Sequence, residues 1–299
     1  MARMDRTSET GILLYAQGDA FGKGSYDLRS LELIVTNYRL IVDHLLPLAV
    51  GQKTLTDRIK DEVKYKVEIN NGSLEVILNF ILEHPELFAA AAASDGGYQL
   101  ASFISKLIDG VVNLRRALTA ILQNGQKPII HIDQSIHQDN SVTYNIKTGD
   151  INLSNPQLII GADATKYALD RLINGIDGSA ISGIDLSHQK LKTTLTARDR
   201  EITGTQKEEL ATQIEVMGRL DMAAITSHRA HIITGNSRYP VTWDESLRSK
   251  IKKFFDTEGI IFKVRPVVDH RKFKDDPIGF HVLDCWAPQV RLDVSSNDF

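Results

Sequence analysis

The chain has 299 residues, which is enough for two domains of ordinary size or for one large domain. Hydrophobic residues make up 42% of it, charged residues make up 24%, and the formal net charge is −3. These values exclude a collagen-like, disulfide-rich or wholly disordered chain, and they argue against a nucleic-acid-binding protein that is basic throughout. The only cysteine, Cys285, cannot form an internal disulfide, so a reducing, cytoplasmic location is expected.

No stretch of the sequence has the length and apolar character of a signal peptide or of a membrane span, which needs roughly 18–20 apolar residues. The closest approach is residues 87–122, where glycine and charged residues interrupt the apolar ones. Within it, apolar side chains recur every three or four positions, at Leu100, Phe103, Ile104, Leu107, Ile108, Val111 and Leu114. This spacing predicts an amphipathic helix over residues 99–122 that packs against protein, and no membrane span is expected.

The segment before this helix indicates a mixed α/β domain. Residues 11–18 form a short apolar run ending in glycine, which is typical of a buried strand. Helical spacing follows from Leu28 to Leu45, and Pro47 is expected to end that helix. Alternation over residues 62–69, an Asn-Asn-Gly turn and a second run over residues 73–82 predict a β-hairpin.

The segment after this helix carries a second, smaller β signal. It begins with the run from Pro128, and two alternating arms follow over residues 142–153 around the Thr148-Gly149-Asp150 turn. Helical spacing returns over residues 162–173, and a short strand is expected over residues 181–186. Residues 1–186, including helices within 83–123, are therefore predicted to form the N-terminal domain. The polar residues 187–213 are predicted to be a linker, helical in part over residues 206–213.

Residues 214–299 are predicted to form a separate small β domain. Five strands are expected there, over residues 214–226, 230–234, 238–242, 260–269 and 279–286. Between the third and fourth strands, residues 244–256 predict a helix with Asp244 as N-cap and with Leu247, Ile251, Phe254 and Phe255 on one face. Five short strands with one inserted helix favour a small barrel. The predicted fold class is α+β: a mixed α/β domain with a central helical segment, and a C-terminal β-barrel.

A glycine-rich turn over residues 18–25 lies between a predicted strand and a predicted helix, which is the context of a phosphate-binding loop. That loop needs four residues between its outer glycines and a Ser or Thr directly after its Lys. Here three residues separate Gly18 from Gly22, and Gly24 follows Lys23. The spacing therefore favours a plain turn.

His131, Asp133, His137 and Asp139 have the residue types of a metal site, and the first two would share one face of a strand. They also fit the solvent side of a strand whose Ile130 and Ile132 face inward, and this interpretation is favoured. Cys285 lies in an apolar strand, where a free thiol is typically a small core residue. No catalytic residue, metal or cofactor is predicted.

Residues 229–274 contain eleven Lys or Arg residues against five Asp or Glu residues. Small barrels bind nucleic acid through such surfaces. Over residues 214–299 the totals are thirteen and twelve, so the excess is local. The predicted nucleic-acid-binding residues are Arg248, Lys250, Lys252, Lys253, Lys263, Arg265, Arg271 and Lys272.

Three features carry a resemblance to known chains: a Y-x-x-G-D-A sequence at residues 15–20, the sequence KVEINNGSLEV at residues 66–76, and a later T-G-D hairpin ahead of five C-terminal strands. Together they resemble a family of uncharacterised bacterial proteins that pair an N-terminal domain of unknown function with a small five-stranded barrel. The resemblance implies no activity, cofactor or catalytic residue. Because such chains resemble accessory genes of mobile or phage-defence regions, it implies a role in antiviral defence.

The leading hypothesis is a non-enzymatic, cytoplasmic bacterial protein that acts through self-assembly or a protein partner. Its predicted contact residues are Phe103, Ile104, Leu107 and Val111 on the central helix. The first alternative is nucleic-acid binding by the basic face of the barrel. The second is a hydrolase or nuclease whose active site is assembled from residues far apart in the sequence.

Overall fold

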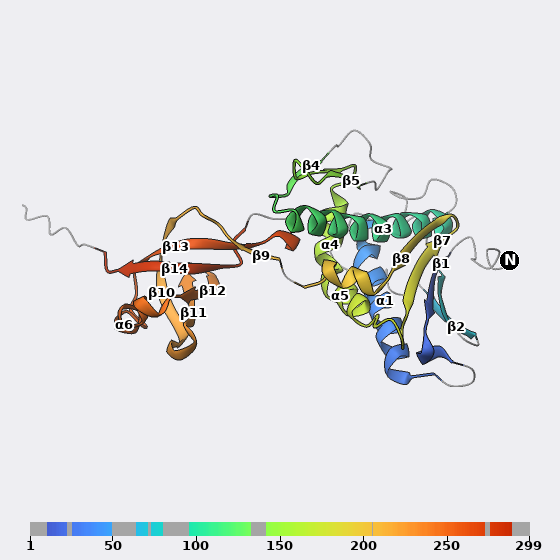
Figure 1. The fold of residues 1–299 in the computed structure, drawn as a ribbon, viewed down its shortest axis with the longest axis horizontal. Coiled ribbons are helices and arrows are strands. Elements are labelled where there is room, and N and C mark those ends of the chain that lie inside the picture. Colours follow the sequence, from blue (N-terminus) through green and yellow to red (C-terminus); the bar gives the residue numbers. More distant parts are fainter. Residues whose placement is uncertain are drawn as a thin grey trace, which may run out of the picture. The chain divides into compact units, whose positions relative to one another are not determined.

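The computed structural model describes residues 11–22, 26–49, 64–70, 73–79, 96–132, 142–204, 206–272 and 276–288. The chain divides into two compact units, Met1–Gly204 and Thr205–Phe299. Helices and strands are mixed in the first unit, and the second is dominated by strands (Figure 1). The predicted α+β class is confirmed.

The N-terminal unit is built on a sheet of five antiparallel strands in the order β2-β3-β1-β7-β8. The hairpin predicted after the first helix is present and consists of β2 and β3. The bounds are β1 (Gly11–Gln17), β2 (Lys64–Asn70), β3 (Ser73–Asn79), β7 (Gly183–His188) and β8 (Leu191–Leu195).

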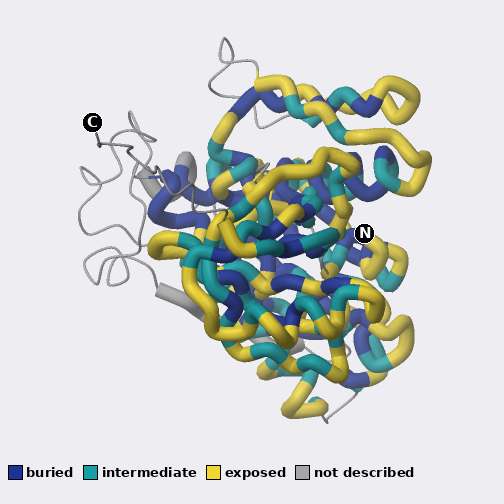
Figure 2. The backbone as a smooth tube through the Cα atoms, turned by 90° about the vertical axis from the view of Figure 1, so that its left-hand side faces the viewer, coloured by how far each residue is buried: buried dark blue, intermediate teal, exposed yellow. Residues whose placement is uncertain are grey.

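Two long helices, α1 (Leu28–Ala49) and α3 (Gly96–Gln123), supply most of the core over this sheet. The inward side chains of β1, at Ile12, Leu14 and Ala16, are completely buried, and the Tyr38 hydroxyl on α1 donates a hydrogen bond to the Ile12 carbonyl at 3.1 Å. Figure 2 marks the buried residues in dark blue along the backbone. Contrary to the prediction, Pro47 does not end α1, which continues to Ala49. Pro47 and the apolar residues around it are buried, and this packing compensates for the backbone hydrogen bond that proline cannot donate.

Beside α3 lies a small sheet in the order β4-β6-β5, which confirms the second β signal (Figure 1). Its strands are β4 (Ile129–Ile132), β5 (Val142–Asn145) and β6 (Asp150–Leu153). The helix predicted over residues 162–173 is instead two helices, α4 (Gln157–Ala164) and α5 (Lys166–Asn174). They meet at Thr165, whose hydroxyl donates a hydrogen bond back to the Gly161 carbonyl at 2.7 Å.

Most of the predicted linker over residues 187–213 belongs to the N-terminal unit. Leu191–Leu195 is strand β8, and a 3-10 helix, η3 (Ala197–Ile202), follows it with a capping box formed by Thr196 and Asp199. The segment predicted to be partly helical contains a short strand, β9 (Lys207–Glu209). The polar composition misled the prediction because threonine favours strands and Thr193 buries its hydroxyl in a 2.7 Å hydrogen bond to Asp109.

The C-terminal unit contains the five predicted strands, closed into a barrel. They are β10 (Ile214–Ala224), β11 (Arg229–Thr234), β12 (Ser237–Trp243), β13 (Ile260–Asp269) and β14 (Gly279–Trp286). They follow the order β10-β11-β12-β14-β13, and β13 pairs back with β10. The third and fifth strands, β12 and β14, are parallel, and the other pairs are antiparallel. This strand order, with a helix between the third and fourth strands, is the topology of an OB-fold.

The inserted helix closes one part of the barrel core. It consists of η5 (Glu245–Leu247) and α6 (Arg248–Lys253), and Ile251 is completely buried while Leu247 and Phe254 pack against the core. Phe255, predicted on the same face, is instead 44% exposed. The Asp244 side chain makes no capping hydrogen bond; its backbone carbonyl accepts one from the Leu247 N–H at 3.0 Å.

Candidate nucleic-acid interface

The helix residues predicted to contact a partner lie in the core of the N-terminal unit. Ile104 and Leu107 are completely buried, Val111 is 2% exposed, and Phe103 is partly buried. The apolar face of α3 therefore packs against other parts of the same chain. A partner cannot reach the three buried side chains while the unit is folded.

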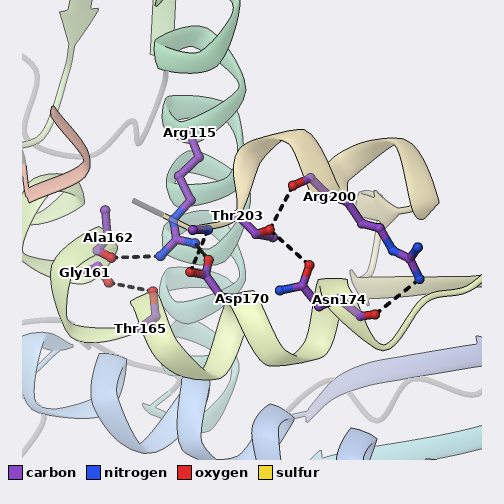
Figure 3. Close-up of polar contacts among 9 residues, drawn as sticks. Arg115, Gly161, Ala162, Thr165, Asp170, Asn174, Arg200 and Thr203 are labelled. Carbon is purple, nitrogen blue, oxygen red and sulfur yellow. Dashed lines mark hydrogen bonds and ion pairs between the residues drawn. The ribbon is translucent and has the colours of Figure 1, made fainter. Parts of the chain in front are cut away.

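Two adjacent arginines of α3, Arg115 and Arg116, also serve the fold. Arg115 is buried; its Nη1 lies 2.7 Å from Asp170 Oδ1, and its Nη2 donates a hydrogen bond to the Ala162 carbonyl at 3.1 Å (Figure 3). The other oxygen of Asp170 accepts the Gly204 N–H at 3.1 Å. Arg116 lies 2.7 Å from Asp199 Oδ1. These pairs join α3 to α5 and to the last residues of the unit.

The predicted metal-like residues are only partly within the described ranges. His131 Nε2 lies 2.9 Å from Asp150 Oδ1 on the neighbouring strand, while Asp133, His137 and Asp139 fall outside these ranges. Over the part of the chain that the structure covers, no three His, Cys, Asp or Glu side chains gather into a possible metal site. In the glycine-rich turn, Asp19–Phe21 form one 3-10 turn, and Lys23 also lies outside the described residues.

Cys285 is a core residue of the barrel, as the sequence predicts. Burial raises the pKa of its thiol to about 11, and the Asp284 charge acts in the same direction while the Lys250 charge opposes it. Because the thiolate is the reactive form, Cys285 should resist alkylation by iodoacetamide at about pH 8 in the folded protein and react readily in denaturant. Mass spectrometry of timed samples measures this difference, and rapid labelling of the folded chain would contradict the burial.

The eight predicted basic residues differ in burial and in ion pairing. Arg271 is 3% exposed and therefore belongs to the interior, which corrects its assignment. Three others are paired with carboxylates: Arg248 with Glu245, Lys250 with Asp284, and Arg265 with Glu209. The Lys250 hydrogen bond lowers the pKa of Asp284, and the same bond raises the pKa of Lys250. Among the described residues, Lys252, Lys253, Lys263 and Lys272 have no carboxylate within ion-pair distance.

The barrel brings together a different set of polar residues, which we call the cross-strand row: Arg229, Thr242, His281 and Arg265. Strand register makes each of them the direct neighbour of the next, from β11 through β12 and β14 to β13. All four are exposed or partly exposed, and they alternate with buried core residues along their strands. The row therefore lies on the outer surface of the barrel and crosses four of its five strands, with Arg229 and Thr242 on the second and third strands and with His281 and Arg265 on the fifth and fourth.

One hydrogen bond connects the middle of the row, because Thr242 Oγ1 lies 3.1 Å from His281 Nδ1. The Asp244 carboxylate lies beside the row, with its Oδ2 3.7 Å from His281 Nε2. At one end Arg265 Nη1 lies 3.0 Å from Glu209 Oε1. At the other end, within the residues described, no carboxylate pairs with Arg229. The row thus presents donors suited to an anion, with one arginine available and one engaged.

The sequence analysis selected Arg265 but not Arg229, Thr242 or His281. Charge counting along the chain ranks lysine-rich segments first, and it gives no weight to a threonine or a histidine. The signal that could have identified Arg229 is the alternation of polar and apolar residues along its strand. Arg229 and His231 occupy alternate positions of a strand whose intervening residues, Ala230 and Ile232, are buried.

Comparisons of this chain with protein-family models, with curated proteins and with solved structures returned no match. Among the helices that the structure describes, none is both long enough and apolar enough to cross a membrane.

Proposed function

We propose that the chain binds single-stranded nucleic acid through the cross-strand row. The observation that carries this proposal is the position of Arg229 and Thr242, two members of the row, on the second and third strands of a barrel of OB-fold topology, the strands that such barrels use for oligonucleotides. The proposal keeps the nucleic-acid alternative of the sequence analysis and, of the eight basic residues predicted there, retains Arg265 on β13 and adds Arg229, Thr242 and His281 from β11, β12 and β14.

The chemistry of the row favours contact with the phosphate backbone. Arginine presents a planar fork of N–H donors to a phosphate, and a threonine hydroxyl or a histidine N–H adds single hydrogen bonds. None of the four members is a Phe, Tyr or Trp, and His281 is the one aromatic ring in the row. Binding should therefore depend weakly on base sequence and strongly on salt.

Removing the two arginines of the row tests this proposal. We expect R229A/R265A to weaken binding of fluorescein-labelled oligo(dT) at low salt by about tenfold or more, because each arginine would lose a charge-assisted hydrogen bond. The slope of log affinity against log salt should fall by about 1.4, since two phosphate contacts are lost. Fluorescence anisotropy over a potassium chloride series measures both quantities.

K252A/K253A is the matched control, because it also removes two positive charges from the barrel unit but from the exposed side of α6. We expect a much smaller loss of affinity. An equal or larger loss of affinity in K252A/K253A would show that helix α6 contacts the nucleic acid. Absence of binding by the unaltered protein would overturn the function.

Assembly is the second proposed function, and one observation favours it. The edge strands and turn of the β4-β6-β5 sheet expose large apolar side chains: Ile129 is 49% exposed, Ile132 40%, Tyr144 45% and Ile146 40%. The exposure of Ile132 corrects the inward position expected for it from the sequence. Exposed apolar side chains grouped on one element are typical of protein contacts. We expect light scattering to give the mass of at least two chains, and I132D/Y144D to give that of one. A single-chain mass for the unaltered protein would contradict assembly. The bacterial, phage-defence setting stays a prediction.

A further inference from the structure

An acidic strand borders the cross-strand row. Strand β9 adds to β13 beside the closed barrel, with Glu209 opposite Val267 and Lys207 opposite Asp269. Hydrogen bonds donated by its flanking backbone N–H groups hold it at both ends: the Gln206 N–H donates to the Asp269 side-chain Oδ1 at 3.1 Å, and the Leu210 N–H donates to the Pro266 carbonyl at 2.9 Å. The three side chains of β9 are all exposed. The strand is therefore fixed by its backbone while its carboxylates face solvent.

The position of β9 places Glu209 next to the end of the row. Its cross-strand neighbour, Val267, lies two residues from Arg265 on β13, so Glu209 and Arg265 share the outer face of the sheet. Glu209 Oε1 lies 3.0 Å from Arg265 Nη1, and the two side chains are 38% and 39% exposed. The pair is therefore in contact with water.

An ion pair of this kind is exchangeable. Exposed pairs contribute little net stability, because water and salt screen the attraction. The guanidinium fork that holds a carboxylate also fits a phosphate, so the same donor can serve either anion. The Glu209 carboxylate occupies the place at Arg265 that a backbone phosphate would take.

We propose that Glu209 is an intramolecular competitor that limits the affinity of the cross-strand row for nucleic acid. This inference rests on the function proposed above. When a strand binds, its phosphate replaces the carboxylate at Arg265, and Glu209 turns to solvent. Arg229 at the other end has no such competitor among the described residues, so the two ends of the row differ in how readily they accept a phosphate.

The neighbouring Glu208 provides a close control. It lies on the same strand and carries the same charge, but its carboxylate contacts His270 Nε2 at 2.5 Å instead of an arginine of the row. Replacing either glutamate with glutamine removes one negative charge from β9 and leaves its backbone pairing unchanged. A difference between E209Q and E208Q therefore reports the contact with Arg265, because the change in net charge is the same.

The experiment measures anisotropy of fluorescein-labelled oligo(dT) over a potassium chloride series for the full-length protein, E209Q, E208Q, R265A and R265A/E209Q. We expect E209Q to bind about two- to fivefold more tightly than the unaltered protein at low salt. Its slope against log salt should stay the same, because the two complexes contain the same number of phosphate contacts. E208Q should change the affinity less, and E209Q should have no more effect than E208Q when Arg265 is absent.

The outcomes separate the two proposals. If the unaltered protein binds oligo(dT) while E209Q and E208Q behave alike, the competitor role is wrong and the proposed function stands. If E209Q tightens binding equally with and without Arg265, the effect is general electrostatics and the competitor role is again wrong. If neither the unaltered protein nor E209Q binds at low salt, the proposed function fails, and the competitor role fails with it.

Discussion

Arg115→Ala is expected to lower the free energy of unfolding of the N-terminal unit by about 3–5 kcal/mol, because it removes one partner of a buried ion pair. The Arg115 side chain is 3% exposed and the Asp170 side chain 16% exposed, so the carboxylate left behind would remain largely shielded from water. The Ala162 carbonyl would lose its hydrogen-bond donor as well. Urea unfolding followed by circular dichroism measures the loss.

Arg116→Ala is the control for this prediction, since it removes the same side chain from the next position of α3. Its ion pair with Asp199 is more open, with the arginine 36% exposed, and we expect a loss of about 1 kcal/mol. Equal losses in the two variants would show that the burial of Arg115 does not govern its contribution.

Phe262→Ala is expected to destabilise the barrel by about 3–5 kcal/mol. Phe262 is completely buried on β13, where its strand neighbours are Cys285 on one side and Val216 on the other. Truncation would leave a cavity that the closed barrel cannot fill without breaking strand pairing. The loss should appear as a lower midpoint in the unfolding transition of the C-terminal unit.

Phe255→Ala is the comparison, because this side chain is 44% exposed at the end of α6. We expect a change within about 0.5 kcal/mol, as for other surface positions. A loss as large as that of Phe262→Ala would show that Phe255 is a core residue, as the helical spacing predicts.

The barrel strands were predictable because each buries one face, and this burial leaves a period of two in the sequence. The bounds expected for β13 and β14 match the structure. Strand β8 was missed for the opposite reason. Its LKTTL sequence looks polar, and Thr193 is buried only because it bonds to Asp109, which is 84 residues away in the chain. No local pattern records a partner at that distance.

The candidate site was less accessible to sequence reasoning than the fold. Its members come from four strands, and their adjacency depends on the register of three strand pairs, one of them parallel. Hydrophobic alternation shows which residues face outward, but it does not show which outward residues are neighbours. The apolar face of α3 was assigned to a partner for a similar reason. The spacing of its apolar residues is the same whether they pack against the rest of this chain or against another protein.

The pairing of β9 with β13 also determines which residue should begin an isolated fragment of the barrel. Only the first half of β13 is covered by β10, whose pairing reaches Val264, and β9 covers Val267 to Asp269. A fragment that began at Ile214, the first residue of the predicted barrel domain, would leave those backbone groups as an open sheet edge. Open edges recruit strands from other molecules, so such a fragment would tend to aggregate through β13. A fragment that begins at Thr205 retains its own edge strand.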